Sequence, residues 1–152
     1  MRVTGTGLEA VAAMIAANLT AQLVKFLRDW RKHRRPNLTL LVATGGMPSS
    51  HSATVAALTT SVGLVAGWEA PVFAVAFCFA GIVMYDAAGL RRAASEQARV
   101  LNEIVEELLA PQHHLNVNKL KEFLGHTPRE VLAGALLGVG LSVGLHWLLR
   151  LF

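Results

Sequence analysis

The sequence has few charged residues for its length. Charged side chains make up 16% of the 152 residues, whereas a typical soluble domain carries about a quarter. Apolar residues make up 53% of the chain, and its mean hydropathy is +0.45. A chain with so little charge cannot cover an ordinary water-facing surface. The bilayer is its natural solvent, and we expect an integral membrane protein.

Cysteine is also nearly absent. Cys78 is the single cysteine and lies within an apolar run, so the chain can form no internal disulfide and has no cysteine spacing of a metal site. We expect Cys78 to be a small buried or lipid-facing residue. No cofactor and no metal are predicted. The length suits a single membrane-embedded domain over residues 1–152.

Four apolar segments approach the roughly 20 residues that a membrane-spanning helix needs. They cover residues 8–27, 50–66, 71–89 and 128–149; the second is short and rich in Ser and Thr, so its depth stays open. Apolar side chains repeat at helical spacing over residues 92–109, which predicts an amphipathic cytoplasmic helix lying on the membrane surface or packed on the bundle. The predicted fold class is therefore all-α, an integral membrane bundle of about four transmembrane helices plus one amphipathic helix.

Positive charge gathers on one side of these segments. Of the 14 Lys and Arg residues, 12 lie in the first and third connections between the segments or at their edges, where Lys25 and Arg129 stand. By the positive-inside rule this side is cytoplasmic, so both termini lie outside a plasma (inner) membrane. We expect the basic residues to face the lipid bilayer surface, with no nucleic acid partner.

Small residues recur at four-residue spacing in the last segment. Gly134, Gly138 and Ser142 follow this spacing, with Gly140 and Gly144 beside them. Small residues let membrane helices approach closely. The neighbour is either another helix of the chain or a second copy, so a homo-oligomer formed through this Gly-rich helix is one alternative.

Residues 44–52 have the character of an anion site. Gly46 frees the backbone for a tight approach, and Ser49 and Ser50 stand where a helix begins, with a serine as its N-cap. Helix starts offer N–H groups and a positive dipole end, which suit a phosphate, and His51 falls in the first turn. The alternative is a plain serine-capped helix with an interfacial histidine.

A second histidine precedes the last segment. His126 is followed by Thr127, Pro128, Arg129 and Glu130, the pattern of a capping box with proline at the first helical position. Glu130 is thus explained by capping alone. Its functional alternative is to orient the His126 imidazole, a side chain that can accept a phosphoryl group. Both interpretations can hold together.

Several charged residues fall at the same predicted membrane face. Lys25 either snorkels or completes a cationic cup for phosphate. Arg91 and Arg92 are either topology anchors or phosphate clamps. Asp86 can pair with an arginine, bind Mg²⁺ or orient a histidine. The other histidines lack a motif and are predicted to be surface or interface residues: His33, His113, His114 and His146.

These pieces together resemble the divergent PAP2 family, small membrane proteins related to acid phosphatases. The matching stretches are residues 21–25 (AQLVK), 44–53 (TGGMPSSHSA), 86–92 (DAAGLRR) and 120–131 (LKEFLGHTPREV). The resemblance implies that Lys25 and the 48–51 stretch bind phosphate, that His51 is a general acid, and that His126 is a nucleophile supported by Glu130. Ser50 replaces the usual glycine, and Leu120 stands where an arginine is expected, a role left to Lys119, Lys121, Arg91 or Arg92.

The resemblance implies a phosphatase acting at the cytoplasmic face on a membrane lipid phosphate, such as phosphatidylglycerophosphate or phosphatidate, without a metal. Two alternatives remain at this point. One is a Mg²⁺-dependent phosphatase or a phosphotransferase that uses Asp86. The other is a non-catalytic membrane protein that binds phospholipid through the same residues.

Overall fold

The computed structural model describes residues 4–36, 46–109 and 125–151, and within these ranges it is helical with no strand. The elements in chain order are α1 (Gly7–His33), α2 (Ser50–Ala66), α3 (Pro71–Tyr85), the π-helical turn η2 (Asp86–Leu90), α4 (Arg91–Leu109) and α5 (Pro128–Leu151). The predicted all-α fold class is confirmed.

The predicted helix bounds agree closely with the observed ones, with two differences. The first segment was expected to end at residue 27, but α1 continues to His33, so most of the basic stretch expected as a connection is helical. α2 covers the predicted residues 50–66, and α5 begins at Pro128 as predicted. The third segment was expected to run to residue 89, but regular α-helix ends at Tyr85 because the backbone widens there into η2. The axis then continues directly into α4.

Small residues at every fourth position bring α1, α2 and α5 together. The buried core of this contact consists of alanines from α1 and α2: Ala13, Ala17, Ala21, Ala53 and Ala57. On α5, a Cβ added at Gly138 would collide with the Ala53 carbonyl oxygen and lie 3.0 Å from the Ala57 nitrogen. The close approach predicted for the last helix is therefore correct, and its neighbour is α2 of the same chain.

α2 is the central helix, and the others present their outer faces to lipid. Ten of the 17 residues of α2 are buried, whereas Ala80 is the buried residue of α3. Large apolar side chains on the outer faces are exposed, among them Leu19, Val75 and Leu136. Within the described ranges, three helices are long and apolar enough to cross a membrane, namely Gly7–His33, Pro71–Glu106 and Pro128–Leu151. α2 is shorter and lies among them.

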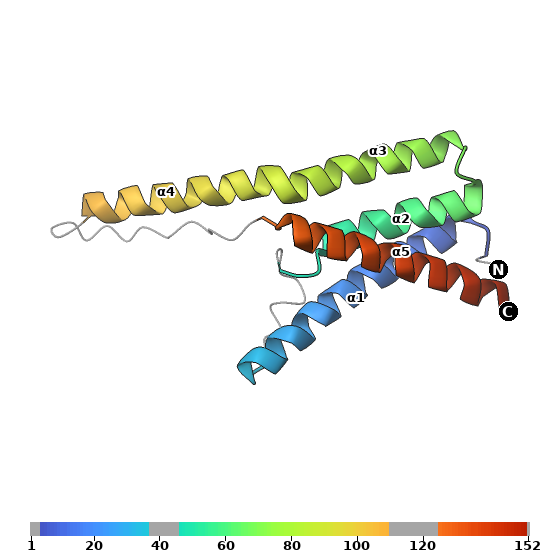
Figure 1. Cartoon of the computed structure of the whole chain (residues 1–152), viewed down its shortest axis with the longest axis horizontal. Coiled ribbons are helices and arrows are strands. Elements are labelled where there is room, and N and C mark those ends of the chain that lie inside the picture. The colour runs from blue at the N-terminus through green and yellow to red at the C-terminus, as the bar shows by residue number, and fades with distance from the viewer. Residues whose placement is uncertain (1–3, 37–45, 110–124, 152) are drawn as a thin grey trace.

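Figure 1 shows how the ends of the helices sort into two groups. Both termini and the connection between α2 and α3 lie at one end of the bundle, and the starts of α2 and α5 lie toward the other. α4 continues the line of α3 through η2 and extends beyond the bundle. Neither placement expected for the amphipathic helix, on the membrane surface or packed on the bundle, is seen, because η2 keeps α4 in line with α3.

Candidate active site

The start of α2 is fastened to the first turn of α5. The hydroxyl of Ser49 caps α2 by accepting the Ser52 backbone N–H at 3.3 Å, and the Ser49 N–H donates to the Glu130 carbonyl oxygen at 3.0 Å. Ser49 is fully buried. A serine N-cap was predicted, and the structure assigns it to Ser49. Because both polar groups of Ser49 are engaged within the fold, Ser50 is the serine that faces the site.

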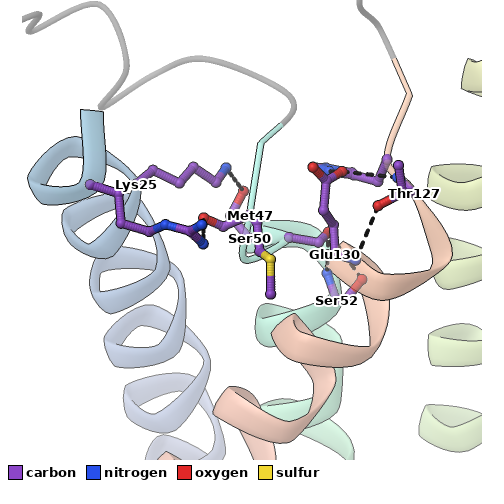
Figure 2. Close-up of polar contacts among 9 residues, drawn as sticks. Lys25, Met47, Ser50, Ser52, Thr127 and Glu130 are labelled. Carbon is purple, nitrogen blue, oxygen red and sulfur yellow. Dashed lines mark hydrogen bonds and ion pairs between the residues drawn. The ribbon is translucent and has the colours of Figure 1, made fainter. Parts of the chain in front are cut away.

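Lys25 reaches across from α1 to that serine. Its Nζ donates a hydrogen bond to the Ser50 Oγ at 3.2 Å, and both side chains are buried. Figure 2 shows Lys25 extending from its helix toward the start of α2. A lysine that snorkels would turn its ammonium outward, so this geometry favours the cationic cup. Gly46 adjoins it, with φ at +78° and space for a Cβ 3.8 Å from the Lys25 Cδ.

The start of α5 contains the predicted capping box. The Thr127 N–H donates to Glu130 Oε2 at 2.9 Å, and the Glu130 N–H donates to Thr127 Oγ1 at 3.4 Å (Figure 2). The same carboxylate oxygen lies 3.4 Å from Nδ1 of His126, whose side chain is almost fully buried. Glu130 therefore takes part in the capping box and also lies close enough to His126 to orient its imidazole. A carboxylate beside Nδ1 favours the tautomer that keeps Nε2 as the nucleophilic nitrogen.

The π-helical turn holds the backbone of His126. The His126 N–H donates to the Ala87 carbonyl oxygen at 3.0 Å, and Ala87 lies inside η2. A π-helical turn changes the ordinary pairing of helix carbonyls and is frequent at functional sites. No feature of the sequence predicted this turn. Asp86, the first residue of η2, is thereby placed one residue from the carbonyl that anchors His126.

The two histidines lie face to edge. The ring centroids of His51 and His126 are 6.0 Å apart, with an interplanar angle of 64°. His51 is the second residue of α2, directly after the serine that Lys25 contacts. We define the helix-end site as five residues from α1, α2, α5 and the segment just before α5: Lys25, Ser50, His51, His126 and Glu130. Sequence analysis singled out all five, and the structure brings them together.

Other predicted residues are not placed in this set. Arg91 and Arg92 begin α4, but their side chains lie outside what the structure describes, as does the whole of Lys121. Within the described ranges, no group of three or more His, Cys, Asp or Glu side chains is arranged to hold a metal ion.

Two polar residues of α1 were not singled out from the sequence. Gln22 lies one turn before Lys25, and its carboxamide oxygen is buried without a hydrogen-bond partner among the described residues. Asn18 donates from Nδ2 to Thr54 Oγ1 at 3.0 Å, which ties α1 to α2 one turn below Ser50. The signal was present in the spacing of four and then three residues that leads from Asn18 through Gln22 to Lys25, which places all three on one face of α1.

His146 was predicted to be a surface or interface residue, and this prediction is wrong. His146 is buried, and its Nδ1 lies 2.5 Å from Oε1 of Glu9, which is also buried. The other oxygen of Glu9 accepts the Gly5 N–H at 2.8 Å. A buried polar side chain needs such a partner. The pair joins the beginning of α1 to the end of α5, at the opposite end of the bundle from the helix-end site.

Comparison with known proteins adds an independent finding. The profile of the divergent PAP2 family matches residues 8–141. The chain is 41% identical over 139 residues to the uncharacterized membrane protein YuiD of Bacillus subtilis (strain 168), an alignment that covers 85% of this chain and 88% of that protein. No solved structure matches at a significant level. The matched residues include every member of the helix-end site.

Proposed function

The chain belongs to the divergent PAP2 family, and from this premise we propose that it is a membrane phosphatase that hydrolyses a lipid phosphomonoester through a phosphohistidine intermediate. The observation that carries the proposal is the 6.0 Å separation of the His51 and His126 rings beside the buried contact of Lys25 with Ser50. A nucleophile, an acid and a cation thus meet at one helix start.

Phosphate binding is assigned to the start of α2. The ammonium of Lys25 and the hydroxyl of Ser50 already lie 3.2 Å apart, so one phosphate oxygen can contact both. The positive end of the α2 dipole adds to this attraction. Fixed groups of this kind stabilise negative charge most strongly where water is excluded, and both side chains are buried.

The reaction then proceeds in two displacements. Nε2 of His126 attacks phosphorus, the phosphorus–oxygen bond to the lipid breaks, and His51 donates a proton to the departing alkoxide. Water next attacks the phosphohistidine and gives its proton to His51, which releases inorganic phosphate and restores His126. The Glu130 carboxylate, 3.4 Å from Nδ1, stabilises the positive charge of the imidazole during both steps.

Membrane placement follows the distribution of basic residues. The helix-end site lies with the basic cluster at the end of α1, so we assign it to the cytoplasmic face of the plasma membrane, with both termini outside. Phosphatidylglycerophosphate and phosphatidate are the substrates to test first.

The test is release of inorganic phosphate by the purified protein in lipid nanodiscs, from each of the two lipids, with and without EDTA and vanadate. Changing His126→Ala should abolish release, and His51→Ala should lower it by about 10²–10⁴-fold, the usual contribution of a proton donor. His33→Ala is the matched control, because His33 is exposed and pairs with Asp29 away from the site.

Three results would contradict the proposal. Turnover that survives in His126→Ala excludes this nucleophile. Loss of activity in EDTA favours the metal-dependent alternative through Asp86. Lipid binding without release from either lipid favours a non-catalytic phospholipid-binding protein.

A further inference from the structure

An apolar groove runs between α2, α3 and α5 on the lipid-facing side of the bundle. Its volume is about 300 Å³, and it is walled by small residues of α2 and α5 and by phenylalanines of α3. Trp68 and Phe73 close its far end, where their rings meet edge to face with centroids 5.1 Å apart. The groove exists because α3 packs on α2 through small residues such as Ala80 while its larger side chains stay exposed.

The near end of this groove lies beside η2, the turn that holds the backbone of His126. Met84 lines it, and Met84 lies three residues before Ala87, whose carbonyl oxygen binds the His126 N–H. Three residues of helix correspond to about 4.5 Å along the axis. A molecule lying in the groove therefore ends within one helical turn of the carbonyl that positions His126.

The lining and the length of the groove indicate what it can hold. From Phe73 to Met84 the helix rises about 16 Å, and along this length the lining is mostly apolar. An extended hydrocarbon chain suits such a groove. It would run from the end of α3 beside η2 toward the connection between α2 and α3.

We propose that this groove binds one acyl chain of the lipid whose phosphate occupies the helix-end site, and that the Trp68–Phe73 pair sets the chain length it accepts. This inference rests on the proposed function. It specifies the substrate class as a phosphomonoester that carries at least one acyl chain and enters from the leaflet beside α3. Lipid phosphates with a shorter chain fill less of the groove and bind more weakly.

Gly81 offers a clean way to block the groove. It lines the groove one turn from Met84, and a Cβ added there meets nothing within 4 Å. Gly81→Leu therefore fills the passage without disturbing the packing of α3. Gly140→Leu is the matched control, because Gly140 is equally open, lies on a helix of similar character, and is not part of the groove lining.

The experiment uses the full chain in nanodiscs with phosphatidate whose acyl chain carries a photoactivatable diazirine, near the glycerol in one probe and at the chain end in another. Crosslinked residues are mapped by mass spectrometry, and phosphate release is measured in parallel. We expect the first probe to label the region of Met84 and the second the region of Phe73. Gly81→Leu should lower labelling at Phe73 by about tenfold, while Gly140→Leu leaves it unchanged. Thermal unfolding of both variants checks that they fold.

The two readouts separate the two proposals. Labelling in the groove without phosphate release supports the groove as a chain site and refutes the phosphatase. The groove inference is overturned if labels spread evenly over the outer faces of α1 and α5 and Gly81→Leu is indistinguishable from Gly140→Leu. Phosphate release in the same experiment would still support the proposed phosphatase activity.

Discussion

Replacing Gly134 by alanine tests whether the close contact of α5 with α2 positions the helix-end site. An ideal Cβ at Gly134 lies 3.1 Å from both the carbonyl carbon and the nitrogen of Ser49, and still closer to the Ser49 carbonyl oxygen. Ordinary contacts begin at 3.4 Å, so the backbone of Ser49 and the start of α5 must move apart. Ser49 carries both the cap of α2 and the hydrogen bond to Glu130, so the separation displaces the start of α2 itself.

The magnitude follows from two opposing contributions. Overpacking of a tight contact costs about 1–3 kcal/mol, whereas alanine stabilises a helix over glycine by about 1 kcal/mol. Gly140→Ala, on the same helix with nothing within 4 Å, receives only the second contribution. The difference in free energy of unfolding between the two variants therefore isolates the overpacking cost, and we expect about 1–3 kcal/mol.

The phosphate-release activity of Gly134→Ala should fall by more than its loss of unfolding free energy would explain. Displacement of catalytic groups by an ångström can cost about 10²-fold in rate, so we expect a loss approaching this size in Gly134→Ala. Gly138→Ala should be destabilised to a similar extent, because its Cβ would meet the backbone of Ala53, one turn farther from the site, but should lose less activity. Thermal unfolding in detergent and phosphate release measure the two effects.

The reasoning would be refuted by a single outcome. If Gly134→Ala equals Gly140→Ala in both stability and turnover, then α5 and α2 do not touch at Ser49. The helix-end site would then be positioned by something other than this contact.

Three further predictions concern single residues. Glu130→Gln should retain the capping box and the stability, because glutamine also serves in a capping box, while turnover falls. Glu130→Ala should in addition lose about 1 kcal/mol of unfolding free energy. Equal turnover in Glu130→Gln and the wild type would show that capping is the whole role of Glu130. Lys25→Met, which keeps the length of the side chain without its charge, should reduce turnover by about 10²–10³-fold in the phosphate-release assay, and full activity would remove Lys25 from the site. His146→Leu should lower the free energy of unfolding by about 3 kcal/mol because it leaves Glu9 buried without its partner, and Glu9→Leu combined with it should recover part of the loss; additive losses would contradict the pairing.

Local signals in the sequence predicted most of the fold. Hydropathy and segment length predicted the bounds of α2 and α5 to within about two residues. The pattern from Thr127 to Glu130 predicted a capping box that the structure contains. The five residues of the helix-end site were also identified in advance. All of them stand at span ends on the side that the positive-inside rule predicts to be cytoplasmic, so the predicted topology was sufficient to group them.

Features that depend on pairing between distant residues were not predictable in the same way. The Glu9–His146 contact joins residues 137 positions apart. η2 contains Gly89, but a lone glycine does not distinguish a π-helical turn from the end of an α-helix. His146 nevertheless continues the four-residue spacing of Gly134, Gly138 and Ser142. A histidine in register with a stripe of packed small residues is a signal of burial that hydropathy does not register.

The length of α2 has a consequence for the membrane around the protein. Seventeen residues rise about 25 Å, which is about 5 Å less than the hydrocarbon core of a typical bilayer. Because longer helices surround α2, this difference leaves the ends of α2 recessed below the bilayer surface, and its first turn carries Ser50 and His51. We expect lipid head groups to sink toward these residues, so that a substrate reaches them without leaving its leaflet. Bilayer thickness thereby becomes a physical variable that governs access to the site.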